Sequence, residues 1–157
     1  MLAVTIPGRG ELQLEHLVLD VNGTLVCDGV LIPGVAERLH QVRNVLKVHL
    51  LSADTYGQLD ALARDLGVPA TRLRTGEPEP PQKATYIRQL HSSTVVAIGN
   101  GANDVDMLSE AAIGIVVVGP EGAAVATLTA ADLVTGSITD ALDLLSHPKR
   151  LIASLRR

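Results

Sequence analysis

Short, mostly aliphatic runs recur along the chain at positions 17–19, 45–51, 94–98 and 113–118. They are rich in β-branched residues and place apolar side chains at successive positions. This pattern is typical of strands that are buried on both faces of a parallel sheet. We therefore expect these four runs to form the core strands of such a sheet.

Apolar residues with helical spacing separate and follow the runs. They predict helices over 35–44, 56–66, about 80–91, 104–112 and 138–145, with Pro148 marking a break before a last basic helix. Alternating strands and helices predict an α/β fold with a doubly wound, mainly parallel sheet flanked by helices. In such sheets ligands bind at the carboxyl ends of the strands.

Two hairpins and one loop complete this outline. Alternating residues at 2–6 and 11–14, joined by 7–10, predict an accessory hairpin within the first 15 residues. Asp28-Gly29 predicts a second hairpin between 25–26 and 30–31. The stretch TGEPEPPQ at 75–82 is expected to be a loop inside a single domain that spans 1–157.

Composition narrows the class of protein. With 46% hydrophobic and 19% charged residues, the 157-residue chain has enough apolar surface to fold as one domain. A net charge of -4 and only two aromatic residues argue against nucleic-acid binding. The single cysteine excludes an internal disulfide, and no apolar run reaches the ~18 residues that cross a bilayer. We expect a soluble, cytoplasmic protein.

Two polar residues stand where expected strands end. Asp20 ends the first run and is followed by Asn22-Gly23-Thr24, where a glycine lets backbone amides turn toward an anion. The alternative is a β-hairpin turn at Asn22-Gly23. Ser52 ends the next run and its hydroxyl suits a phosphoryl oxygen, although a serine there also suits a helix cap.

Two further features come later in the chain. Lys83 lies early in an expected helix, where a lone lysine is usually a surface charge. The loop GNGAND at 99–104 joins a strand to a helix, and its spacing matches neither the dinucleotide fingerprint nor the Walker loop. Asp104 also suits the first turn of a helix.

In this order, LVLDVNGTL, LLSADT, Lys83 and IGNGANDVDML resemble the four motifs of the haloacid dehalogenase-like (HAD) hydrolase superfamily. Residues 20–24, 52–54, 99–104 and 130–134 are most similar to the phosphorylation domain of P-type ATPases. The resemblance implies a Rossmann-like fold without a large cap domain. Without membrane segments, ion pumping is not expected.

The resemblance also implies an activity, that of a Mg²⁺-dependent phosphatase in which Asp20 accepts the phosphoryl group as an aspartyl-phosphate. The implied catalytic residues are Asp20, Asn22, Ser52 and Lys83, and the implied phosphate-binding residues are Gly23, Ser52, Ala53 and Lys83. The implied Mg²⁺ ligands are Asp20, Asn22, Asn100 and Asp104. The implied supporting residues are Thr24, Gly99, Gly101 and Asn103. The expected partner is a phosphorylated substrate, and neither nucleic acid nor membrane is expected.

Two departures from the motifs change the expected chemistry. Asn22 stands where HAD phosphatases usually place a general acid, so we expect slow turnover of alkyl phosphates or a long-lived phosphoenzyme. Asn100 replaces the first acid of the last motif, so we expect weaker metal binding. The alternatives are a non-catalytic or regulatory protein that binds phosphate or a partner, and a metal-independent dehalogenase.

Overall fold

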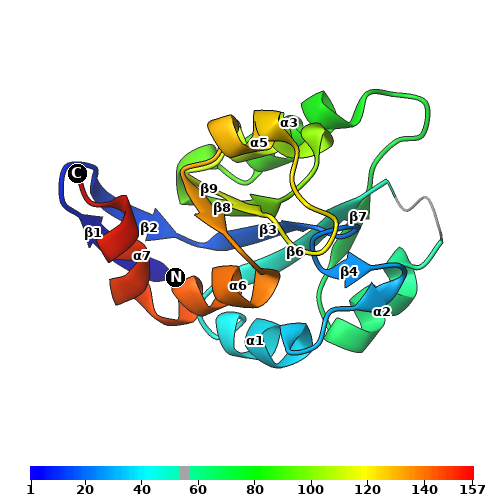
Figure 1. The fold of residues 1–157 in the computed structure, drawn as a ribbon, viewed down its shortest axis with the longest axis horizontal. Helices are drawn as coiled ribbons and strands as arrows, with labels where there is room; N and C mark the ends of the chain where they lie inside the picture. Colours follow the sequence, from blue (N-terminus) through cyan, green and yellow to red (C-terminus); the bar gives the residue numbers. More distant parts are fainter. Residues whose placement is uncertain (54–56) are drawn as a thin grey trace.

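The computed structural model describes residues 1–53 and 57–157, and its centre is a six-stranded parallel sheet (Figure 1). The strand order is β10-β9-β8-β3-β6-β7. The strands are β3 (His16–Asp20), β6 (Lys47–Ser52), β7 (Ala70–Arg72), β8 (Val95–Gly99), β9 (Ile113–Val117) and β10 (Leu133–Thr135). The predicted doubly wound α/β fold is thereby confirmed.

Helices cover both faces of this sheet (Figure 1). Leu17 and Leu19 of β3 pack on one face with α1 (Val35–Val42), α2 (Leu59–Leu66) and α6 (Ile138–Ser146). Val18, which points to the other side, packs with α3 (Glu79–Gln89) and α4 (Val105–Glu110), and α5 (Val125–Ala130) lies beside α4. Because successive strand residues alternate between faces, an unbroken apolar run supplies both layers of the core.

The N-terminal hairpin is formed as predicted. β1 (Leu2–Ile6) pairs antiparallel with β2 (Gly10–Leu14), and α7 (Pro148–Leu155) packs against β1. Arg9, between the two strands, pairs through its Nη1 with Asp132 Oδ1 at 2.8 Å. The second carboxylate oxygen of Asp132 accepts the Gly114 N–H at 2.9 Å. Asp132, within the segment 130–134 that resembles a P-type ATPase motif, therefore has a structural role here.

The second hairpin also forms as predicted, with β4 (Val26–Cys27) antiparallel to β5 (Val30–Leu31). Asp28 and Gly29 have φ values of 51° and 78°, as a tight two-residue turn requires. The alternative hairpin at Asn22-Gly23 does not form. There the backbone N–H groups of residues 24–26 converge instead on the carbonyl of Val21.

Three short elements, β7, β10 and α5, were not predicted, because three to six residues are too few to show a period. The predicted loop 75–82 was partly wrong, since α3 already begins at Glu79. Helix α2 begins at Leu59, and residue 56, where the predicted helix begins, lies outside the described residues. None of the described helices combines the length and the apolar composition that a membrane-spanning segment needs.

Candidate active site

The strand order brings the predicted site residues together. β3 lies between β6 and β8, so Asp20, Ser52 and the loop after Gly99 all stand at the carboxyl edge of three adjacent parallel strands. The chain moves from β3 to β6 on one side and later returns to β8 on the other. The site thus occupies the point where the winding of the sheet reverses, which is where open α/β sheets bind ligands.

Lys83 joins two carboxylates beneath this edge. Its Nζ lies 2.7 Å from Asp20 Oδ1 and 2.7 Å from Asp104 Oδ1. Lys83 and Asp104 are 0% exposed and Asp20 is 5% exposed. Helix α3 delivers the lysine from the face that also buries Ala84 and Ile87. The surface-charge interpretation of Lys83 was therefore wrong: it is the one buried cation among the residues that the structure describes.

Burial, together with the charges of their neighbours, shifts the pKa values of Asp20 and Lys83. Burial lowers the pKa of Lys83, but the carboxylates of Asp20 and Asp104 raise it by more, so the ammonium keeps its proton. Burial, together with repulsion from Asp104, raises the pKa of Asp20 to about 7 against the opposing effect of Lys83. The single ammonium of Lys83 balances the charge of only one of the two carboxylates, Asp20 and Asp104. A further cation beside Asp20 would therefore favour its ionised form.

Asp104 also organises the loop from which it comes. Its Oδ2 accepts the backbone N–H groups of Asn100 and Gly101, each at 3.0 Å. A Cβ on Gly99 would lie 2.5 Å from Asp104 Cγ, so only glycine fits there. The Asn103 side chain donates to Glu79 Oε2 at 2.6 Å and thereby ties the loop to α3. Both oxygens of Asp104 are engaged by protein donors.

Thr24 connects the nucleophile candidate to the loop. Its Oγ1 lies 3.2 Å from Asp20 Oδ2 and 3.2 Å from Asn100 Oδ1. The Asn100 amide nitrogen donates to the carbonyl of Gly122 at 3.2 Å, and its carboxamide oxygen faces the Thr24 hydroxyl. A carboxylate and a carboxamide oxygen therefore both lie next to the Thr24 hydroxyl. These are the hard donors that Mg²⁺ prefers, so the residues present fit this ion.

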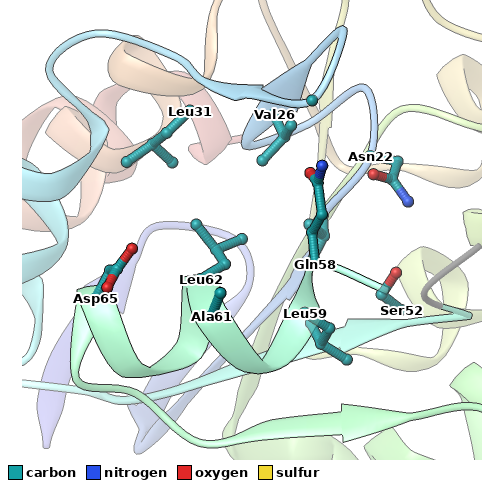
Figure 2. A pocket seen from close by; sticks show the side chains of 11 residues that line it. Asn22, Val26, Leu31, Ser52, Gln58, Leu59, Ala61, Leu62 and Asp65 are labelled. Carbon is teal, nitrogen blue, oxygen red and sulfur yellow. The ribbon is translucent and has the colours of Figure 1, made fainter. Parts of the chain in front are cut away.

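Asn22 and Ser52 line a cavity of about 390 Å³ between α2 and the β4–β5 hairpin (Figure 2). Asn22 is exposed, whereas Ser52 is 3% exposed and the adjacent Ala53 is half-buried. Gly23 has a φ of 79°, and a Cβ there would lie 2.6 Å from Glu121 Oε2. Asp54, the last residue of the motif 52–54, lies outside the described residues.

Glu121 and Gln58 are site residues that the sequence analysis missed. Glu121, in the loop after β9, and Gln58, just before α2, line a second cavity of about 450 Å³ that also includes Asn22 and Gly29. The strand before Glu121 was predicted, and ligands bind at the carboxyl ends of such strands. That rule, applied to every predicted strand, would have indicated Glu121.

The chain is similar to a protein family and to a protein of known sequence. A family model described as haloacid dehalogenase-like hydrolase matches residues 6–112. The chain is 48% identical over 62 residues to the uncharacterized protein MJ0073 of Methanocaldococcus jannaschii, which is 40% of this chain and 67% of that protein.

Solved structures share the fold. A 3-deoxy-D-manno-octulosonate 8-phosphate phosphatase from Moraxella catarrhalis, in complex with a magnesium ion, a phosphate ion and a KDO molecule, superposes with a TM-score of 0.67 at 19% identity. The match covers 91% of this chain and 94% of that one. A phosphoserine phosphatase in apo form also has a TM-score of 0.67, at 15% identity, and the match covers 83% of this chain and 98% of that one.

Proposed function

The chain belongs to the haloacid dehalogenase-like hydrolase family, and from this premise we propose that it is a Mg²⁺-dependent phosphohydrolase that works through an aspartyl-phosphate on Asp20. The observation that carries the proposal is the buried arrangement of Asp20, Lys83 and Asp104 at the carboxyl edge of the sheet. The solved structure with magnesium and phosphate supports the choice of ion and substrate group.

In the proposed first step, a carboxylate oxygen of Asp20 bonds to phosphorus while the bond from phosphorus to the leaving oxygen breaks. The leaving oxygen takes a proton from water. Water then attacks the aspartyl-phosphate, which releases inorganic phosphate and restores the carboxylate. Lys83 and the hydroxyl of Ser52 stabilise the phosphoryl oxygens, and Gly23 and Ala53 offer backbone N–H groups beside them.

Bound Mg²⁺ would supply positive charge to the phosphoryl oxygens as negative charge develops on them. The residues that would hold it are Asp20 through a carboxylate oxygen, Asn100 through its carboxamide oxygen, and Asn22. Asp104 was also expected to be a ligand, but both of its oxygens already accept protein donors, so in this proposal it contributes its negative charge and the position of the loop. Compared with a site that has an acid at position 100, this donor set carries one negative charge less, which weakens its attraction for the ion.

The test of the proposal is phosphate release from 4-nitrophenyl phosphate with and without Mg²⁺. We expect slow, steady release that stops when a chelator removes the metal and returns when Mg²⁺ is restored. Thermal stabilisation by inorganic phosphate without any turnover would instead support the non-catalytic alternative. Metal-independent halide release from a haloacid would support the dehalogenase.

Replacing Asn22 by aspartate should raise the rate on alkyl phosphates. An amide has no proton to give to the leaving oxygen, whereas general acid catalysis contributes ~10²–10⁴-fold. Asn22 is exposed and lines the cavity beside Ser52, so an added carboxyl group meets little steric hindrance. We expect kcat/KM to increase at least about ten-fold for an alkyl phosphate. It should change little for 4-nitrophenyl phosphate, because its leaving group, 4-nitrophenolate, departs without a proton. An equal change for both substrates would contradict this role of position 22.

A further inference from the structure

The cavity beside Ser52 is long and follows α2 (Figure 2). Ser52 and Asn22 lie at one end, and Asp65, near the end of α2, lies at the other. From Leu59 to Asp65 the helix rises about 9 Å at 1.5 Å per residue. A molecule whose phosphoryl group is bound at Ser52 can therefore extend along α2 as far as the carboxylate of Asp65.

The middle of the cavity is apolar. Leu62 of α2 and Val26 of the β4–β5 hairpin point toward each other across it, and Leu31 lies above (Figure 2). Val26 is 7% exposed, and Leu31 and Leu62 are half-buried. Contact with these side chains favours a flat or aliphatic group in the section next to the phosphoryl end.

The charges around the cavity are all negative. Asp65 is the ionisable residue of its lining, and Asp28 and Glu121 line the adjoining second cavity. The two cavities share Asn22 and Gln58, and the Gln58 side chain reaches to within 3.5 Å of the Cβ position of Gly29. Neither Lys nor Arg is among the described residues that line either cavity. An anionic leaving group would be repelled, and a cationic one attracted.

We propose that the substrate is a phosphate monoester whose leaving group is apolar beside the ester oxygen and carries a protonated amine at its far end, facing Asp65. This inference rests on the phosphohydrolase function proposed above. The proposed substrate differs in charge from that of the structural neighbour named 3-deoxy-D-manno-octulosonate 8-phosphate phosphatase, because octulosonate is an anion.

Three aryl phosphates of nearly equal size test the inference. They are the O-phosphate of tyramine, 4-ethylphenyl phosphate and the O-phosphate of 3-(4-hydroxyphenyl)propanoate, which end in a cation, a neutral group and an anion. All three release a similar phenol, so the missing general acid affects them alike. We expect kcat/KM to fall in that order, with about a ten-fold difference between cation and anion. High salt should reduce the difference, because Asp65 is exposed.

Asp65→Asn removes the charge with little change in shape. It should bring the tyramine and ethylphenyl phosphates to within about two-fold of each other. Asp65→Lys should reverse the order of the three substrates. Asp60→Asn is the matched control, because it makes the same change of charge on α2 at a residue that faces Arg72 at 3.3 Å instead of the cavity. We expect this control to keep the original order.

The possible failures are distinguishable. Equal rates for the three phosphates, or a preference for the carboxylate, would overturn the inference and leave the phosphohydrolase function intact. A preference for the amine that Asp65→Asn and Asp60→Asn reduce equally would also overturn it, because net charge alone would then explain the preference. No hydrolysis of any of the three by the folded protein with Mg²⁺ would overturn the proposed function and this inference with it.

Discussion

The Asp20→Asn protein should fold normally and lose at least about 10³-fold in the rate of 4-nitrophenyl phosphate hydrolysis. An amide is too weak a nucleophile to attack phosphorus, so no aspartyl-phosphate can form. Asparagine has nearly the shape of aspartate, and Lys83 keeps its partner Asp104 at 2.7 Å. Because burial and Asp104 raise the pKa of Asp20 to about 7, a neutral side chain at this position costs the fold little.

The measurements for Asp20→Asn are kcat/KM with Mg²⁺ and the thermal midpoint of unfolding. Asp106→Asn is a suitable control, because Asp106 is an exposed acid on α4 only two residues beyond Asp104. We expect the control to retain full activity. If the Asp20→Asn protein kept more than a tenth of the activity, Asp20 would not be the nucleophile, and the proposed mechanism would be wrong.

Replacing Lys83 by methionine should destabilise the protein by about 3–5 kcal/mol. Methionine fills most of the space of the lysine stem, so the loss is mainly electrostatic. Without the ammonium, the buried carboxylates of Asp20 and Asp104 face each other with no counter-ion. Urea unfolding near neutral pH measures this loss. Lys149→Met, at an exposed position on α7, should change the free energy of unfolding by less than about 0.5 kcal/mol.

Two further measurements separate this electrostatic cost from a packing defect. Unpaired buried carboxyl groups have raised pKa values in the folded state, so they bind protons more tightly there than in the unfolded chain. Stability lost at neutral pH should therefore return as the pH falls, and the Lys83→Met protein should gain more than the unchanged chain between about pH 7 and pH 5. Adding Asp20→Asn should restore part of the loss. A loss that neither acid nor Asp20→Asn reduces would show that the cause is packing.

Much of the fold could be predicted because its signals are local. The aliphatic runs at β3, β6, β8 and β9 show burial on both faces within five or six residues each. The turn at Asp28-Gly29 carries its own positive φ preference. Where a local pattern was compatible with two structures, packing between distant segments determined which of them forms. The Asn22-Gly23 pair is also typical of a hairpin turn, but the backbone N–H groups of residues 24–26 bond to the Val21 carbonyl instead, and a side chain at Gly23 would meet Glu121 and Asn100.

The candidate site was predictable to a different extent. The sequence by itself determined which polar residues end the buried strands, because an aliphatic run and the polar residue that follows it are visible in adjacent positions. That Asp20, Ser52 and the loop 99–104 lie at one edge follows from the parallel order of β6, β3 and β8.

Only the tertiary structure decided how these groups pair and what surrounds them. Lys83 could be buried because α3 carries it beneath two carboxylates, and no local pattern distinguishes it from a surface lysine. The apolar-walled cavity lies between α2 and the β4–β5 hairpin, and the loop after β9 lines the adjoining second cavity. These segments are far apart in the chain, so the charge and shape of the two cavities exist only once packing has brought them together.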